Sequence, residues 1–117
     1  QPTFFLKRWV REKKVFSLEE AIRMMTSRTA EVMGITDRGR LAQGMPADVV
    51  VFDPATVGDE PLQRVYDFPA GADRLISEAR GISNVIVNGT VIREQGADAV
   101  ADGAPLPGQL LRSGAAA

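Results

Sequence analysis

The chain has 117 residues, an apolar share of 44% and a formal net charge of −1. Its length suits one domain or one piece of a larger one, and its apolar share is that of a globular protein rather than a disordered one. The near-neutral charge argues against a general nucleic-acid or anionic-membrane binder, which needs a basic excess, and no apolar run approaches the ~20 residues that span a bilayer.

The first predicted element is an amphipathic helix over residues 3–14, for which Thr3 is a suitable N-cap. Apolar side chains recur there at i, i+3 and i+4 spacing. Such an aromatic stripe is typical of a face packed in a core, and the basic residues between its members are expected to form a solvated face. The stripe consists of Phe5, Leu6, Trp9 and Val10, and the basic residues are Lys7, Arg8, Arg11 and Lys14.

A second helix is predicted to begin after Ser17. Ser17 at the N-cap and Glu20 three residues later form a capping box, in which each side chain satisfies a free backbone N–H. The helix is expected to pause near Thr26, where Ser27 can cap a short further helix that ends at Gly34, a residue type favoured just after a helix. The methionines of this region are expected to fill gaps in the core rather than to hold a metal or cofactor. They are Met24, Met25 and Met33.

The sequence pattern changes after residue 36. Residues 37–44 suggest a turn, a short strand and another turn. Residues 49–52, three valines and a phenylalanine, form a continuous apolar run that is typical of a strand buried on both faces. Asp48 at the start of this run is a candidate catalytic carboxylate. An aspartate at a turn-to-strand junction more often accepts backbone N–H groups, and we favour that interpretation.

Residues 54–81 are predicted to form a long loop, because prolines and glycines interrupt every pattern there. A connection of this length is usually functional, mobile or a cover for another part of the molecule. Its acidic residues match no metal-binding spacing.

A β-hairpin is predicted next, with strands over residues 83–87 and 90–94. Asn88 and Gly89 join them and supply the positive φ angles of a type I′ turn. The tail is rich in Gly, Ala and Pro, and it is expected to be flexible from about residue 112. Three leucines before that point are expected to anchor it. They are Leu106, Leu110 and Leu111.

Histidine and cysteine are both absent from the sequence. The lack of cysteine removes disulfides, thiolate nucleophiles and cysteine-bound zinc, and it is compatible with the cytoplasm, where we expect the protein to lie. The lack of histidine removes the commonest metal ligand and the commonest general base near neutral pH. No residue of this chain is therefore identified as catalytic, cofactor-binding or metal-binding.

Two groups of motifs resemble the C-terminal end of amidohydrolase-superfamily enzymes. The broader group, similar in hydantoinases, dihydroorotases and ureases, comprises Met25-Thr26, Ala30, Gly34 and residues 39–44, 47–53 and 85–89. The narrower group resembles the N-acyl-D-amino-acid deacylases, also called D-aminoacylases. It comprises residues 4–6, 9–13, 16–21, 51–57 and 107–112. Together they cover nearly the whole chain and are weakest over residues 58–81.

The resemblance implies a metal-binding (β/α)₈ barrel, a TIM-type barrel, with a small β-sandwich built from both chain ends. We therefore expect an α+β fragment in which residues 1–36 are the terminal helices of the barrel and residues 37–117 are the C-terminal part of the β-sandwich. The family's metal ligands, mainly histidines, lie upstream at the ends of barrel strands, and none maps onto this chain. The expected fragment was cut from a longer enzyme, has a structural role, and is inactive alone.

The implied parent enzyme hydrolyses the amide bond of N-acyl-D-amino acids with a zinc-bound hydroxide and an aspartate as general base and acid. Its zinc would be bound outside this chain. The implied partners are the remainder of the parent chain and a small-molecule substrate, with neither nucleic acid nor membrane, and the isolated fragment is expected to self-associate through apolar surface. Two other functions stay open: an amidohydrolase of cyclic amides or esters, and a free-standing binding or assembly module.

Overall fold

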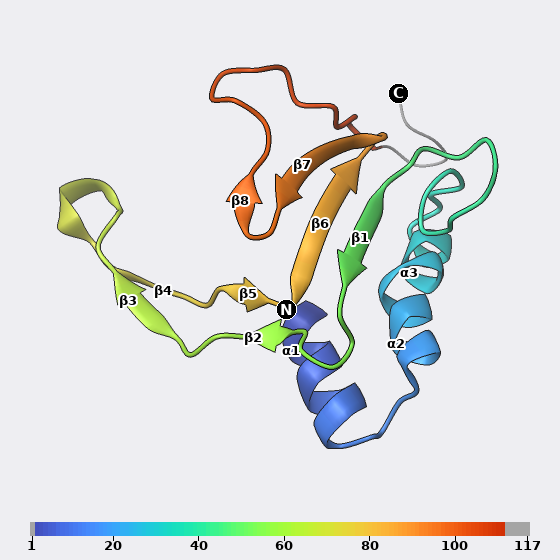
Figure 1. Cartoon of the computed structure of the whole chain (residues 1–117), viewed down its shortest axis with the longest axis horizontal. Helices are drawn as coiled ribbons and strands as arrows, with labels where there is room; N and C mark the ends of the chain where they lie inside the picture. Colours follow the sequence, from blue (N-terminus) through green and yellow to red (C-terminus); the bar gives the residue numbers. More distant parts are fainter. Residues whose placement is uncertain (1, 112–117) are drawn as a thin grey trace.

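A computed structural model describes residues 2–111 and shows helices followed by antiparallel strands (Figure 1). The helical elements are α1 (Pro2–Phe5), η1 (Leu6–Glu12), α2 (Leu18–Met25), α3 (Ser27–Val32) and η2 (Pro69–Gly71). The strands are β1 (Val49–Phe52), β2 (Gly58–Asp59), β3 (Gln63–Val65), β4 (Arg74–Ile76), β5 (Ala79–Arg80), β6 (Ile82–Val87), β7 (Thr90–Glu94) and β8 (Ala97–Asp98). The main sheet has the order β1-β6-β7-β8, and the pairs β2-β5 and β3-β4 are separate. The predicted α+β class is confirmed.

The first helix begins as α1 and continues as η1, which has the i→i+5 hydrogen bonds of a π-helix. The helix includes Pro2, so Thr3 lies within the first turn instead of capping it. Each residue of a π-helix turns through a smaller angle than in an α-helix, and the predicted apolar stripe is therefore only partly correct. Leu6 is buried and Val10 packs against the core, but Trp9 is 41% exposed.

The predicted capping box is present at the start of α2. The Glu20 N–H donates to Ser17 Oγ at 3.1 Å, and the Ser17 N–H donates to Glu20 Oε2 at 3.3 Å. These bonds satisfy two backbone donors that the helix itself cannot satisfy. The sequence therefore determines this helix start locally, without help from the rest of the fold.

The substitution Ser17→Ala should lower the free energy of unfolding by about 1 kcal/mol, because it removes the acceptor of the Glu20 N–H. Urea denaturation followed by circular dichroism would measure the change. Ser17→Asp is the matched control, since aspartate is an equally good N-cap, and it should leave the transition nearly unchanged. Equal losses in both variants would contradict the capping explanation.

The short helix α3 begins one residue earlier than expected, with Thr26 as N-cap and Ser27 as its first residue. Its end matches the prediction. Gly34 has a φ of 68°, and the Ile35 N–H donates to the Ala30 carbonyl at 2.9 Å, which is the pattern of a Schellman motif.

The hairpin between β6 and β7 is confirmed. Asn88 and Gly89 have φ angles of 48° and 80°, as a type I′ turn requires. The prediction that β1 is buried on both faces is wrong for this chain, because Val50 and Val51 are 51% and 45% exposed. Within residues 2–111, β1 is the edge of its sheet and pairs only with β6. Its composition suits a central strand, but no strand of the described residues lies beside its second edge.

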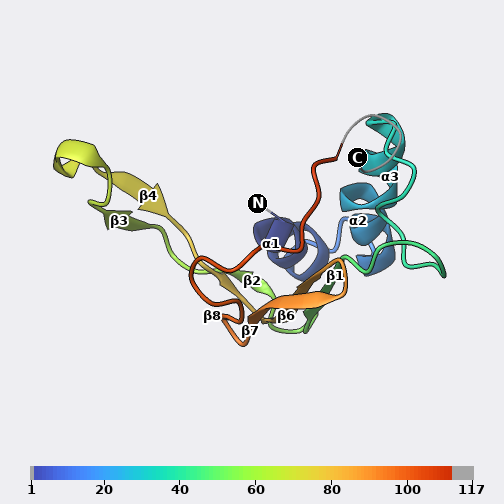
Figure 2. The same ribbon diagram turned by 90° about the horizontal axis from the view of Figure 1, so that it is seen from above.

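Two further predictions about local structure are wrong. Residues 37–44 form turns and bends rather than a short strand. Residues 54–81, predicted as a long loop, contain the two antiparallel pairs β2-β5 and β3-β4. The second pair, with η2 at its tip, extends away from the helices and the main sheet (Figure 2). These short strands carry no alternating apolar pattern long enough to be recognised in the sequence.

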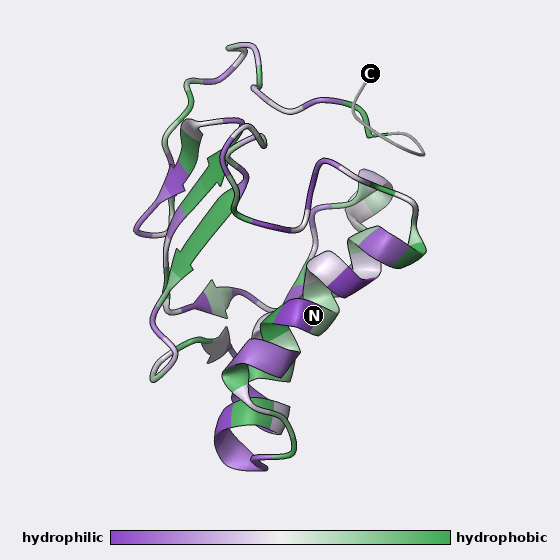
Figure 3. Ribbon diagram, turned by 90° about the vertical axis from the view of Figure 1, so that its right-hand side faces the viewer, coloured by the Kyte–Doolittle hydropathy of each residue, from purple (hydrophilic) through white to green (hydrophobic). Residues whose placement is uncertain are grey.

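The buried core is small and joins the helices to the segment after β1. Leu6, Ala21 and Val57 are at most 5% exposed, and partly buried side chains such as Phe52 pack around them. Figure 3 shows apolar residues along the long strands of the main sheet. The helices and the start of the β region therefore form one packed unit.

The methionines and the tail depart in part from expectation. Met25 packs against the core, but Met24 and Met33 are 44% and 62% exposed and fill no core gap. Leu106 and Leu110 are more exposed still, at 73% and 69%, so they do not anchor the tail as expected. The predicted flexible tail from about residue 112 lies outside the described residues.

No helix within residues 2–111 is both long and apolar enough to cross a membrane.

Candidate functional site

Asp48 lies in a polar cluster at the start of β1. Its Oδ1 accepts the Asn88 N–H at 2.7 Å, which ties β1 to the hairpin turn. Its Oδ2 lies 2.7 Å from Arg38 Nε, in an ion pair that is not an aligned hydrogen bond. Arg38 Nη1 also lies 2.7 Å from Asp37 Oδ2. The favoured interpretation of Asp48, as an acceptor of backbone N–H groups, is confirmed.

This cluster is suited to holding the fold together rather than to acid–base chemistry. The Arg38 side chain is only 9% exposed and neutralises two carboxylates. Both oxygens of Asp48 already have partners within the chain. These contacts hold the Asp48 carboxylate between the hairpin turn and Arg38, which is the arrangement of a structural acceptor. Sequence reasoning missed Arg38, because its ten-residue separation from Asp48 within a turn region follows no recognisable period.

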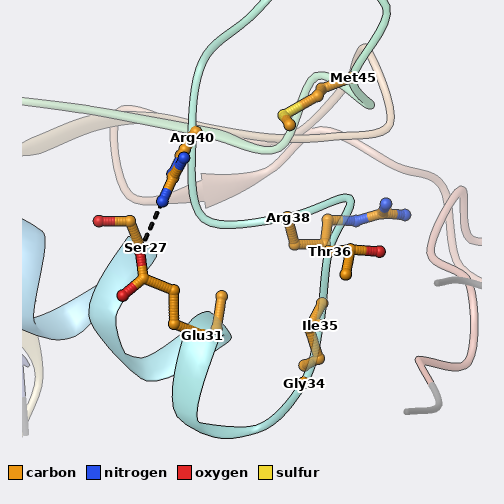
Figure 4. Close-up of a pocket in the computed structure, with 9 residues that line it drawn as sticks. Ser27, Glu31, Gly34, Ile35, Thr36, Arg38, Arg40 and Met45 are labelled. Atoms are coloured by element: carbon orange, nitrogen blue, oxygen red, sulfur yellow. Dashed lines mark hydrogen bonds and ion pairs between the residues drawn. The ribbon is translucent and has the colours of Figure 1, made fainter. Parts of the chain in front are cut away.

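A pocket of about 350 Å³ lies between α3 and the loop that follows it (Figure 4). In the close-up, Arg40 extends across the pocket toward α3, and Met45 lies on the loop side. The Arg40 guanidinium forms an ion pair with Glu31, and both side chains are more than 40% exposed. The pair places a cation and an acid on the same side of the pocket. The lining residues are Ser27, Ala30, Glu31, Gly34, Ile35, Thr36, Arg38, Arg40 and Met45.

Basic side chains of η1 join the helix to the segment after β1. Lys7 Nζ lies 3.0 Å from Asp59 Oδ1, and Arg11 Nη1 donates to the Val57 and Pro54 carbonyls at 2.6 and 3.1 Å. The prediction of a solvated basic face is therefore wrong for Lys7 and Arg11. The hydrogen bond from Lys7 holds the pKa of Asp59 below its ordinary value.

Replacing Lys7 with methionine should raise the pKa of Asp59, because it removes the hydrogen bond and the nearby positive charge that favour the carboxylate. The pKa of Asp59 is lower in the folded than in the unfolded protein. The Lys7–Asp59 pair therefore stabilises the fold fully at pH values above the unfolded pKa, and this stabilisation is lost as the pH falls through the folded pKa. That loss lies below about pH 4. Carboxyl-carbon NMR over this pH range would measure the pKa of Asp59 in the original chain and in the Lys7→Met variant.

Asp67 is the matched control within the same samples. A hydrogen bond from Arg74 lowers the pKa of Asp67, and Lys7→Met leaves that pair intact. The pKa of Asp67 should therefore stay constant while that of Asp59 rises. A parallel rise of both would indicate general unfolding rather than loss of one ion pair.

No group of three or more acidic side chains within residues 2–111 is arranged to hold a metal ion, and the sequence offers neither histidine nor cysteine. The polar clusters of the described chain are thus pairs and triads of opposite charge. Lys7 joins η1 to a segment that is distant in the sequence, and Arg38 joins the loop after α3 to the start of β1.

Comparisons with known proteins give a consistent result. Residues 2–93 match the model of the amidohydrolase family. An N-acyl-D-glutamate deacylase of Alcaligenes xylosoxydans xylosoxydans is 42% identical over 110 residues, which is 94% of this chain and 20% of the relative. An N-acyl-D-aspartate deacylase of the same organism is 41% identical over 112 residues, or 96% of this chain and 20% of the relative. A D-aminoacylase, also from that organism, is 38% identical over 90 residues, or 77% of this chain and 17% of the relative.

The chain thus spans about a fifth of the length of these relatives. No solved structure gives a significant match. The motifs quoted above for the narrower resemblance lie on α1, η1, α2, β1 and the tail, so the similarity includes both the helices and the sheet.

Proposed function

The chain belongs to the amidohydrolase family, and from this premise we propose that it is the C-terminal structural segment of a metal-dependent amidohydrolase that hydrolyses the amide bond of N-acyl-D-amino acids. The observation that carries the proposal is the 38–42% identity to three deacylases over 77–96% of the chain. The proposed role is to complete the fold of the parent enzyme.

The open edge of β1 supports the structural part of this proposal. Val50 and Val51 are half exposed, and the strand pairs on one side only. In the proposed enzyme, residues 37–117 are the C-terminal part of a β-sandwich whose remaining strands continue the sheet beside β1. Residues 1–36 are the last helices of the barrel. The shared core of Leu6, Ala21 and Val57 would then fix the orientation of the sandwich on the barrel.

The residues of this chain do not fit the metal site that such an enzyme needs. Zinc in proteins is bound mainly by histidine, cysteine and carboxylate groups. Histidine and cysteine are absent from the sequence, and the acids within residues 2–111 do not gather in threes. In the proposed enzyme the metal ligands lie in the rest of the parent chain, and no step of the hydrolysis is assigned to residues of this segment.

The full-length protein encoded by the gene that contains this sequence tests the proposed activity. It should release D-amino acids from N-acetyl-D-glutamate, N-acetyl-D-aspartate or neutral N-acyl-D-amino acids, and not the L-amino acids from the corresponding L-substrates. A chelator should abolish turnover and zinc should restore it. The isolated 117-residue chain should show no hydrolysis above the buffer rate.

Three results would contradict the proposal. Ring opening of dihydroorotate without deacylation would indicate an amidohydrolase of cyclic amides. A reading frame limited to this segment would indicate a free-standing binding or assembly module. Chelator-sensitive turnover by the isolated chain would show that the segment carries the active site itself.

A further inference from the structure

Strands β3 and β4 form an arm that extends away from the helices and the main sheet (Figures 1 and 2). Gln63 pairs with Ile76, and Arg64 pairs with Leu75. Side chains of directly paired residues point to the same face, and successive residues along a strand alternate between faces. Gln63 and Ile76 therefore lie on one face of the arm, and Arg64 and Leu75 lie on the other.

The face that carries Ile76 is covered by the arm's own residues. Arg74, on that face, lies with its guanidinium carbon 5.4 Å from the centre of the Phe68 ring. It also donates to both carboxylate oxygens of Asp67, at 2.8 and 2.6 Å. Val65 and Ile76 on this face are partly buried.

The opposite face is bare and apolar. Leu75 lies on it, and extending the alternation of β3 by one residue at each end places Leu62 and Tyr66 on the same side. These three side chains, which we call the bare face, are 56%, 67% and 69% exposed. The charged groups on the same side, Arg64 and Asp73, form an ion pair with each other. The bare face therefore has no net charge to complement, and it suits an apolar, uncharged surface.

An arm of this kind requires support from outside itself. An isolated two-stranded hairpin is at best marginally stable in water. The buried core of Leu6, Ala21 and Val57 lies elsewhere, so the arm contributes no residue to it. Covering the bare face would supply the apolar burial that the arm lacks.

The size of the bare face decides which kind of partner fits it. A stable contact between separate chains buries about 800 Å² on each partner, far more than three side chains provide. A surface of the same polypeptide can hold a small patch, because tethering avoids most of the translational and rotational entropy loss. Roughly four-fifths of the related deacylases lies outside the region that this chain matches, since the match covers 20% of them.

We propose that the bare face of the β3–β4 arm docks against an apolar surface in the remaining part of the same amidohydrolase chain. The arm then acts as a strap that fastens this segment to the rest of the enzyme. This inference rests on the proposed function, because it requires a parent chain.

Cysteine labelling tests the docking directly, since the segment contains no cysteine of its own. Leu75→Cys and Gln63→Cys place a thiol on the bare face and on the opposite face of the same arm, both at exposed positions of the 117-residue chain. Each is introduced into the full-length enzyme and into the 117-residue chain, and maleimide labelling of the native proteins is timed. Leu75→Cys should react at least ~10-fold more slowly in the full-length enzyme than in the 117-residue chain, whereas Gln63→Cys should react at similar rates in both. The unsubstituted full-length enzyme gives the background from other cysteines.

Equal labelling rates of Leu75→Cys in the full-length enzyme and in the 117-residue chain would overturn the docking. Slower labelling of this thiol at higher protein concentration would also overturn it, because it would indicate contact with a second copy. If Leu75→Cys fails to fold, Leu62→Cys gives the same comparison of labelling rates. Amide hydrogen exchange of β3 and β4, compared between the unsubstituted full-length enzyme and the 117-residue chain, gives an independent test. Slower labelling of Leu75→Cys in a full-length enzyme without deacylase activity would support the docking and reject the proposed substrate. Deacylase activity without slower labelling would reject only the docking.

Discussion

Replacing Gly81 with alanine should strongly destabilise the fold. Gly81 has a φ of 75°, and an added Cβ would lie 2.5 Å from the Val57 nitrogen and 2.6 Å from its Cα. Val57 is 2% exposed and belongs to the core cluster, so it cannot move freely. The left-handed backbone costs ~1–2 kcal/mol and the overpacking ~1–3 kcal/mol, which together give a loss of about 2–5 kcal/mol. A urea transition followed by circular dichroism measures it.

Gly44→Ala separates backbone strain from the clash. Gly44 has a similar φ of 85°, but nothing lies within 4 Å of an added Cβ there. Its alanine variant should therefore lose only the backbone term, about 1–2 kcal/mol. Similar losses in the two variants would mean that Val57 yields easily and that the core is looser than its burial indicates.

The predictions that succeeded depend on neighbours along the chain. Ser17 and Glu20 are three residues apart, and Asn88 and Gly89 are adjacent, so the bonds and φ angles that they require can be identified from a few residues. Gly34 marks the end of α3 for the same reason. Each of these signals describes a backbone group that must be satisfied locally, and the rest of the fold does not change that need.

The predictions that failed depend on what lies across space. The burial of Val50 and Val51 was inferred from their composition, which reports the environment that a strand suits rather than the strands present beside it. Trp9 was assigned to a core face by α-helical spacing, and a π-helical segment changes that spacing. The arm formed by β3 and β4 is too short to show a period of its own. For β1 the missing information is the neighbouring surface, and for Trp9 and the arm it is the local backbone geometry, which the residue pattern does not specify.

The Arg38 cluster shows the same limit at the candidate site. Asp48 could be identified as an acceptor because it lies at a turn-to-strand junction. Its second partner, Arg38, could not, since the loop between them has no regular structure from which a distance follows. The cluster nevertheless joins three segments: the loop after α3, the start of β1 and the hairpin turn.

Replacing Arg38 with methionine should therefore lower the free energy of unfolding by about 2 kcal/mol. The change leaves the carboxylates of Asp37 and Asp48 without their buried cation, and the loss of one partner from a buried ion pair costs about 3–5 kcal/mol. The estimate is lower here because the Asp48 side chain is 37% exposed and water screens its charge. Arg40→Met is the matched control, since its exposed pair with Glu31 should contribute at most about 1 kcal/mol.

A double-mutant cycle assigns the loss to the ion pair. Asp48→Asn keeps an oxygen that can accept the Asn88 N–H but removes the charge next to Arg38. If the pair is responsible, Arg38→Met combined with Asp48→Asn should cost clearly less than the sum of the two single changes, by ~0.5 kcal/mol or more. Additive losses would instead assign the effect to the pair of Arg38 with Asp37 or to the packing of the Arg38 side chain.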